Sequence, residues 1–396
     1  MSNESRRVVL YIDSLKLGGA ERVTLSWAQW MSEAGWTPFV LTRQPETWDF
    51  YPLPEGVIRV VEPEDPVWMR RLGPMAFPFR VQRLRRWLRN EQIDLAIGMT
   101  SLPAIKLLFA SRWLGLPCVV SERNYPPLKR IGLIWSFLRR WSYPWAALHV
   151  VQTQAVGHWL ARHLGAKRQL LLPNPVNWPL QAFPPHLDAE QWMSEAGVMA
   201  NDPVLLAVGT KSDQKGFDRL VRWWIPLAEQ DQRLQLVIVG LDERPYHGCD
   251  QLADLRALLQ QRPHLQSRLH FPGRVGNLHQ WYARSQIFVL SSRYEGFPNV
   301  LLEAMAAGCC CVAADCPQGP SDLVVSGVNG ILMPFTTDDQ GWVATLNRLL
   351  QDPAEQARLG QAATLVRERY SPTTLAANLM EALASIKSKT QGGVGG

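Results

Sequence analysis

Short apolar runs alternate with stretches of helical periodicity along most of this chain of 396 residues. The first run, residues 7–13 (RVVLYID), predicts a buried strand, and helical spacing continues from it to about residue 34. Further apolar runs predict strands at residues 37–41, 57–61, 95–98, 118–121, 148–152, 204–209, 234–240, 269–272, 286–290, 310–314 and 329–333. Strands that alternate with helices indicate parallel sheets covered on both faces, so we expect an α/β protein with two doubly wound, Rossmann-like halves.

The chain is too long for one ordinary core, which makes two domains the default expectation. Residues from 173 to about 202 are rich in proline and lack a clear period, so they predict an irregular crossing between domains. We therefore expect a first domain over residues 1–175 and a second over residues 176–368. Residues 389–396, which end in GGVGG, predict a disordered tail.

The segment over residues 291–308 (SSRYEGFPNVLLEAMAAG) follows a predicted strand and contains a turn, a helical run and a closing glycine. A strand, a tight loop and a helix N-terminus together form a natural anion site. Glu295 lies in the loop, and Asn299 and Glu303 share one face of the helix because they are four residues apart. A sugar-nucleotide site and a pair of solvated carboxylates on an ordinary strand–helix unit are equally compatible with this spacing.

The sequence EGFPNVLLEAMAAG resembles the E-x7-E signature of retaining glycosyltransferases with the GT-B fold, also called family four or group one. Residues 315–320 (DCPQGP) resemble the variant found in bacterial transferases that extend lipid-linked oligosaccharides and surface polysaccharides. The resemblance covers most of the chain. It implies two facing Rossmann-like domains with the active site in the cleft, an acceptor-binding domain over residues 1–175 and a sugar-nucleotide-binding domain over residues 176–368. It also implies that a C-terminal helix within residues 369–388 crosses back to the first domain.

The same resemblance implies transfer of a hexose or N-acetylhexosamine, with retention, from a UDP- or GDP-sugar, without a metal ion or another cofactor. No D-x-D triplet, which would mark a metal-held diphosphate, occurs in the sequence. Glu295 would bind hydroxyls of the donor sugar, Glu303 those of the ribose, and Lys215 would stabilise charge on the leaving group. The other expected donor-binding residues are Gly19, Arg274, Val275, Phe297, Asn299 and Val300.

Two departures from the family pattern concern cations. Relatives usually carry an arginine where this chain has Thr210, so Lys211 either returns an ammonium group to the site or points into solvent, and both alternatives stay open. Many relatives carry His-Asp where this chain has Arg123 and Asn124. We therefore expect no histidine-assisted step, and we assign Arg123 and Asn124 to the acceptor, with Arg123 contacting an anion.

Charge is unevenly distributed along the chain. Residues 1–175 hold 23 Lys and Arg against 13 Asp and Glu, whereas residues 176–396 hold 18 against 22. Residues 66–90 contain seven arginines and no acid, and residues 128–145 form a second basic amphipathic segment with tryptophans. Such segments suit an anionic membrane surface, although solvated outer helices packed on the sheet would show the same pattern.

We therefore expect a cytoplasmic protein bound peripherally to the inner face of the cytoplasmic membrane, with a lipid-linked saccharide as acceptor. No nucleic-acid-binding motif occurs, and no apolar run is long enough to span a membrane. The cysteine run at residues 309–311 is a poor metal site, since successive strand residues point to opposite faces. A transferase with a soluble acceptor and a non-catalytic sugar-nucleotide-binding protein are the alternatives. Lys215 favours an enzyme, because a binding protein need not keep a leaving-group cation.

Overall fold

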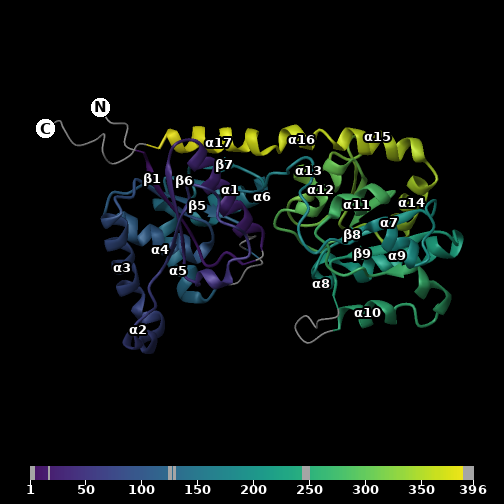
Figure 1. Ribbon diagram of the computed structural model, residues 1–396, viewed down its shortest axis with the longest axis horizontal. Coiled ribbons are helices and arrows are strands. Elements are labelled where there is room, and N and C mark those ends of the chain that lie inside the picture. Colours follow the sequence, from purple (N-terminus) through teal and green to yellow (C-terminus); the bar gives the residue numbers. More distant parts are fainter. Residues whose placement is uncertain (1–4, 17, 124–126, 128–130, 243–249, 387–396) are drawn as a thin grey trace. The chain divides into compact units, whose positions relative to one another are not determined.

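The computed structural model describes residues 5–16, 18–123, 127, 131–242 and 250–386. The chain divides into two compact units (Figure 1). The first unit consists of Met1–Asn174 together with Leu375–Gly396, and the second consists of Pro175–Thr374.

The described part of the first unit is built on a seven-stranded parallel sheet with the order β3-β2-β1-β4-β5-β6-β7. The strands are β1 (Arg7–Ile12), β2 (Thr37–Thr42), β3 (Ile58–Val61), β4 (Leu95–Gly98), β5 (Cys118–Glu122), β6 (Leu148–Val151) and β7 (Gln169–Leu171). The helices are α1 (Gly19–Glu33), α2 (Val67–Leu72), α3 (Phe77–Asn90), α4 (Ser101–Arg112), α5 (Leu133–Ser142), α6 (Gln154–Leu164) and, from the end of the chain, α17 (Pro372–Ala384). Short 3-10 turns occur at Glu46–Trp48, Gly73–Ala76 and Tyr143–Trp145.

Helix α17 completes the core of the first unit, although it lies at the far end of the sequence (Figure 1). Its Leu375, Leu379 and Leu383 are buried among side chains of β1, α1 and β4. Arg6 donates hydrogen bonds to the carbonyl oxygens of Leu383 and Ile386, both at 3.2 Å. The expectation that a C-terminal helix returns to the first domain is thereby confirmed.

The described part of the second unit contains a six-stranded parallel sheet with the order β10-β9-β8-β11-β12-β13. The strands are β8 (Val204–Val208), β9 (Gln235–Val239), β10 (Leu269–His270), β11 (Ile287–Leu290), β12 (Cys310–Asp315) and β13 (Ile331–Pro334). The helices are α7 (Ala189–Glu195), α8 (Ser212–Lys215), α9 (Phe217–Gln230), α10 (Gln251–Ala257), α11 (Leu278–Arg284), α12 (Asn299–Ala307), α13 (Pro320–Leu323), α14 (Asp339–Leu350), α15 (Pro353–Ala363) and α16 (Val366–Arg369), with a 3-10 turn at Pro263–Arg268.

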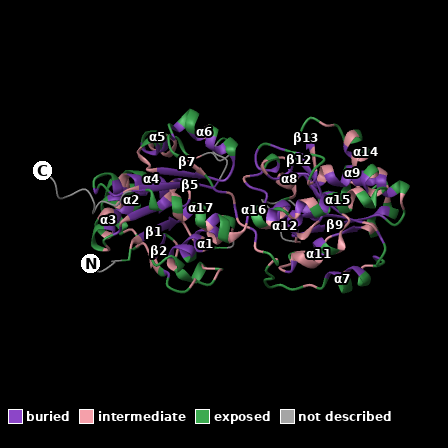
Figure 2. Cartoon of the chain, turned by 90° about the horizontal axis from the view of Figure 1, so that it is seen from above, coloured by how far each residue is buried: buried purple, intermediate pink, exposed green. Residues whose placement is uncertain are grey.

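Both sheets follow from the apolar runs in the sequence. Strands such as β5 and β9 are buried along their whole length, as expected for parallel strands covered by helices on both faces (Figure 2). The predicted α/β fold with two doubly wound sheets is confirmed. Among the described residues, no helix combines the length and apolarity needed to cross a membrane.

Two elements differ from the sequence prediction. Helix α7 lies inside the stretch that was expected to be irregular, where the Asp188 side chain caps it and Ala189 and Met193 are buried. Such a short helix is stabilised mainly by packing, so it leaves little periodicity in the sequence. Strand β7 was not predicted, because it is a three-residue edge strand with only partly buried side chains.

Candidate active site

Glu295 and Lys215 lie at the centre of the candidate site in the second unit. Glu295 follows β11, and its side chain is only 5% exposed. The Lys215 ammonium nitrogen lies 2.7 Å from Glu295 Oε1, and the Ser292 hydroxyl donates a hydrogen bond to the same oxygen. The structure therefore brings together two residues that are 80 positions apart in the sequence and that were assigned to the same reaction.

Glycines determine where Lys215 lies. A Cβ atom at Gly209 would lie 2.7 Å from Lys215 Cγ, so the lysine stem runs directly over this residue. Gly216 has a left-handed backbone (φ 64°), and a Cβ there would lie 2.2 Å from the Ser291 carbonyl oxygen. Glycine at position 216 therefore allows close approach of the two loops, and glycine at position 209 leaves room for the lysine stem.

The loop after β11 is also bonded to the loop that carries Lys215. Ser291 Oγ donates to the Lys215 carbonyl oxygen at 2.8 Å, and the Arg293 backbone N–H donates to the Gln214 carbonyl oxygen at 2.9 Å. The Arg293 guanidinium binds both Asp218 carboxylate oxygens, at 2.7 and 2.8 Å, and this hydrogen bonding raises the pKa of Arg293. Two-pronged pairing of this kind fixes geometry as well as supplying energy, so it holds the two loops together.

Helix α12 begins at Asn299, immediately after this loop, and ends at Ala307, where Gly308 closes it in a left-handed conformation (φ 85°). Glu303 is half-buried on α12. The Tyr282 hydroxyl of α11 donates to the Val300 carbonyl oxygen at 3.1 Å. Burial raises the pKa of Tyr282 well above its ordinary value, and the nearby Glu303 carboxylate raises it further. Tyr282 therefore acts as a neutral donor that positions the first turn of α12.

The segment after β12 packs against the start of α12. A Cβ at Gly319 (φ 95°) would lie 2.5 Å from Pro298 Cδ. The preceding Gln318 has a positive φ of 77°, is buried, and its Oε1 lacks a hydrogen-bond partner among the described residues. Sequence analysis assigned no role to Gln318. Its position within the DCPQGP segment, which contributes to the family resemblance, is the signal that could have found it.

The remaining donor-binding candidates differ in accessibility. Arg274 is exposed and pairs with Asp242 at 2.9 Å, whereas Val275 and Phe297 pack against the core of the second unit. Gly240 connects the loop that carries Arg274 and Val275 to Gly209, which precedes the segment with Lys215. Its N–H donates to the Gly273 carbonyl oxygen at 2.7 Å, and a Cβ there would lie 2.6 Å from the Gly209 carbonyl oxygen.

Thr210 and Lys211 are both exposed, and the role of Lys211 stays a prediction. Their loop is held by Gln251, which sequence analysis missed. Gln251 Oε1 accepts a hydrogen bond from the Ser212 backbone N–H at 2.6 Å, and its Nε2 lies 3.5 Å from the Thr210 carbonyl oxygen. A glutamine at the start of a helix gives no sequence signal for such a contact.

In the first unit, Gly19 is exposed and is the first residue of α1. Arg123 is buried, donates to Ser121 Oγ at 2.8 Å and to Asn174 Oδ1 at 3.1 Å, and stacks on Trp27 at 4.7 Å from the ring centroid. One of its guanidinium nitrogens has no partner among the described residues, and burial lowers the pKa of Arg123 to about 9. The acceptor contact assigned to Arg123 stays a prediction, while Asn124 lies outside the described residues.

The cysteine run contributes to the core. Cys309, Cys310 and Cys311 are buried without disulfide bonds, and burial raises the pKa of the Cys309 and Cys310 thiols to about 12. Over the residues that the structure describes, no group of three or more His, Cys, Asp or Glu side chains is arranged to hold a metal ion.

Comparison with known proteins identifies the family. Residues 17–177 match the family described as Glycosyltransferase Family 4, and residues 188–366 match the family Glycosyl transferases group 1. An uncharacterised glycosyltransferase of Haemophilus influenzae is 31% identical over 42% of this chain and 44% of its own length. A Campylobacter jejuni N-acetylgalactosaminyltransferase, named for a diphospho-undecaprenol substrate, is 24% identical over 91% of this chain and 94% of its own.

Among solved structures, Anabaena HepE in complex with UDP-glucose superposes with a TM-score of 0.76 at 20% identity, over 96% of this chain and 100% of that one. The lipopolysaccharide outer core galactosyltransferase WaaB superposes with a TM-score of 0.71 at 19% identity, over 96% and 99% of the two chains. These structural matches show the fold. With the two family matches, which together span most of the chain, they establish that it belongs to the GT-B glycosyltransferases of family 4.

Proposed function

We propose that this glycosyltransferase moves a hexose or N-acetylhexosamine from a nucleotide diphosphate sugar to a lipid-linked saccharide, with retention at the anomeric carbon and without a metal ion. The observation that carries the proposal is the buried Lys215–Glu295 pair, at 2.7 Å, beside the start of α12. Several of the relatives are named for polysaccharide or lipid-linked saccharide assembly, which supports the choice of acceptor.

In the proposed reaction, Lys215 stabilises the negative charge that grows on the diphosphate as the glycosidic bond breaks. An ammonium group has three donors, and one of them bonds to Glu295, so the other two remain for phosphate oxygens. The site is largely shielded from water, which strengthens this electrostatic contribution. Glu295 retains lone pairs for hydroxyl groups of the donor sugar, so the same pair orients the sugar and its leaving group.

We assign binding of the nucleotide part of the donor to α12. The N-terminal turn of this helix, at Asn299 and Val300, presents the positive end of the helix dipole to a phosphate. Glu303 lies one turn further on and accepts hydrogen bonds from the ribose hydroxyls. Solved structures of the Anabaena relative with UDP and with UDP-glucose support a nucleotide-sugar donor.

A membrane-bound acceptor is supported by the surface of the first unit. Helix α5 exposes Leu133, Ile134 and Phe137, and Leu133 is 90% exposed. Exposed Arg70 and Arg71 on α2, and Arg86 and Arg89 on α3, supply positive charge. Exposed apolar side chains combined with arginines suit the headgroup region of an anionic bilayer, so we place the protein at the inner face of the cytoplasmic membrane.

A thermal-shift screen of the full chain against UDP- and GDP-sugars tests the donor assignment. A matching donor at about 100 times its dissociation constant stabilises the folded state by about 2.7 kcal/mol, which raises the melting temperature measurably. The same donor should be hydrolysed slowly in the absence of acceptor. A shift without any hydrolysis or transfer would instead favour a sugar-nucleotide-binding protein, and hydrolysis that requires a divalent metal would contradict the metal-free reaction.

A further inference from the structure

Polar side chains converge on a pocket of about 420 Å³ in the first unit, which none of the donor residues lines. One side is formed at the carboxyl ends of three adjacent strands, by Tyr11 of β1, Arg43 after β2 and Glu62 after β3. The other side is formed by α2, α3, α4 and α5, with Lys106 of α4 and Trp135 of α5 among the lining residues. Open α/β sheets bind ligands at this edge.

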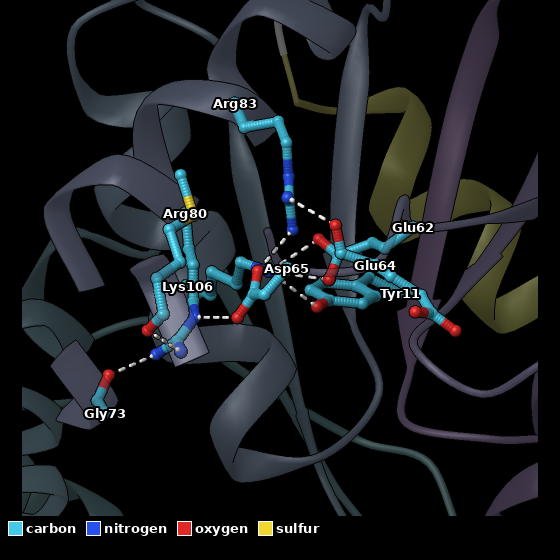
Figure 3. Close-up of polar contacts among 9 residues, drawn as sticks. Tyr11, Glu62, Glu64, Asp65, Gly73, Arg80, Arg83 and Lys106 are labelled. Atoms are coloured by element: carbon cyan, nitrogen blue, oxygen red, sulfur yellow. Dashed lines mark hydrogen bonds and ion pairs between the residues drawn. The ribbon is translucent and has the colours of Figure 1, made fainter. Parts of the chain in front are cut away.

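The most buried part of the pocket is an ion pair. Lys106 donates to both carboxylate oxygens of Glu62, at 2.6 and 2.7 Å, and to the Tyr11 hydroxyl oxygen at 3.2 Å (Figure 3). The Lys106 and Glu62 side chains are 9% and 11% exposed. Burial lowers the pKa of Lys106, and the Glu62 carboxylate opposes this change. Desolvating such a pair costs free energy, and the pair faces a hollow instead of packed side chains, which favours a ligand-binding role.

A second group of charges lines the wall. Asp65 accepts hydrogen bonds from Arg80 at 2.6 Å and from Arg83 at 2.8 Å, and Figure 3 shows these side chains converging from the loop after β3 and from α3. Closer to solvent, Arg43 pairs with Asp13 at 3.1 Å, and both of these side chains are about half exposed.

The balance of charge indicates which ligand the pocket suits. Its lining contains five cations and four carboxylates, and every lining cation except Arg70 pairs with a carboxylate among the described residues. Apart from contacts at Arg70, a phosphate would have to displace carboxylates, and apart from contacts at Glu64, a cation would have to displace arginines or Lys106. A neutral polyhydroxylated ligand meets no such conflict, because carboxylates retain acceptor sites for hydroxyls and guanidinium groups retain donors.

Aromatic side chains add an apolar wall. Trp135 and Phe77 both line the pocket and contact each other edge to face, with ring centroids 5.4 Å apart. The C–H faces of a pyranose ring pack well on such surfaces, while its hydroxyls reach the charged groups at the ring edge.

We propose that this pocket binds a neutral pyranose ring of the saccharide acceptor. The proposal rests on the proposed function only in naming that saccharide an acceptor; the binding itself follows from the pocket. The ion pairs then act as a preorganised set of donors and acceptors that selects a sugar over an anion.

Saturation-transfer NMR on the full chain tests the proposal, with the methyl α-glycosides of glucose, galactose, N-acetylglucosamine and N-acetylgalactosamine as probes. At least one glycoside should bind, and Glu64→Gln and Glu62→Gln should each weaken its binding by about tenfold, since each removes charge-assisted hydrogen bonds. Glu64 is exposed at the pocket, so its substitution leaves the fold intact even where Glu62→Gln does not. Glu55→Gln, exposed elsewhere in the first unit, and Glu91→Gln, which breaks a surface pair with Arg7, are the matched controls and should bind as wild type does.

Kinetics separate this proposal from the proposed function. Glu64→Gln should raise the KM for the acceptor while donor hydrolysis stays unchanged. An absence of both donor hydrolysis and transfer in wild type would defeat the proposed function and leave glycoside binding as an independent result. The pocket proposal is overturned if no glycoside binds, if inorganic phosphate binds in a manner lost in Arg70→Gln, or if Glu64→Gln weakens binding of the nucleotide sugar instead.

Discussion

At the scale of single residues, the site depends on how Lys215 is held. Its stem lies over Gly209, its ammonium group bonds to Glu295, and its carbonyl oxygen accepts from Ser291. A preorganised cation stabilises the transition state more than a mobile one does, because it needs no rearrangement as negative charge develops on the leaving group.

The first prediction concerns this lysine. Lys215→Ala should lower kcat by about 100- to 1,000-fold, the usual cost of removing one preorganised stabilising group. Gly209→Ala should reproduce part of that loss, since the new methyl group displaces the lysine stem. Steady-state donor hydrolysis measures both variants. Gly132→Ala, where a Cβ meets only Trp135 at 4.0 Å, is the control. An unchanged kcat in Gly209→Ala would show that the lysine position is not decisive.

The second prediction concerns Arg123, whose buried charge contacts no carboxylate among the described residues and whose pKa is lowered to about 9. A buried cation without a carboxylate partner costs stability even when it is hydrogen-bonded and stacked on Trp27, so Arg123→Met should keep or raise the melting temperature while transfer to the acceptor falls. Arg59→Met is the contrasting control, because it leaves the partly buried partner Asp49 unpaired and should destabilise the protein. A clear drop in melting temperature for Arg123→Met would contradict this account.

At the scale of elements, α3 and α5 each present two kinds of surface. In α5, Trp135 and Leu138 pack on the core, whereas Leu133, Ile134 and Phe137 face solvent. In α3, Arg80 and Arg83 pair with Asp65, and Arg85 donates to carbonyl oxygens of α4, whereas Arg86 and Arg89 are exposed. Only part of the basic segment seen in the sequence is therefore available to a membrane.

The third prediction follows from this division. The full chain should float with vesicles that contain anionic lipid and should dissociate as salt screens the charges beyond about 10 Å at 0.1 M. Substitution of Arg70, Arg71, Arg86 and Arg89 by Gln should reduce flotation, and so should Phe137→Ser. Leu365→Ser, an exposed apolar residue of the second unit, is the control. Wild-type protein that ignores anionic vesicles at low salt would point to a soluble acceptor.

The elements also show how far the sequence could be interpreted. Buried parallel strands are continuous apolar runs, so β4 and β11 were located almost to the residue, and Gly308 correctly marked the end of α12. The family resemblance assigned Lys215 and Glu295 to one site but did not predict their ion pair, since no local pattern links positions 80 apart. Long-range contacts such as those of Gln251 and Arg293 depend on the folded loops and leave no periodic signal.

The pocket in the first unit illustrates the same limit. In the sequence, residues 62–65 (EPED) form only an acidic cluster after a predicted strand, which a turn at the strand end explains. Glu62 pairs with Lys106 of α4, which is 44 residues away in the sequence, and Asp65 pairs with Arg80 of α3, which is 15 residues away. The role of such an acidic cluster becomes evident only when the fold brings its cationic partners close to it.

At the scale of the whole molecule, the chain returns to its first unit through α17. Leu375, Leu379, Leu383 and Ile386 are all buried there. Burial of each such side chain contributes about 1.5–3 kcal/mol as an upper estimate. The sum is comparable to the stability of an average domain.

The fourth prediction is that removal of residues 372–396 unfolds the first unit and leaves the second unit folded. Hydrogen exchange followed by mass spectrometry should show lost protection in β1, β4 and β5 and retained protection in β8, β11 and β12. The milder variant Leu379→Ala should lower stability by about 2–5 kcal/mol. Equal protection of the first unit in the truncated and full-length chains would contradict the packing role of α17.

The central claim is transfer with retention, and the anomeric configuration of the product tests it most directly. The full chain would be incubated with the α-linked nucleotide sugar that raises its melting temperature and with a lipid-linked saccharide acceptor. The new linkage would then be assigned from the ¹H NMR coupling of its anomeric proton. The account predicts an α-linked product whose formation is lost in Lys215→Ala. A β-linked product, or undiminished transfer by Lys215→Ala, would contradict it.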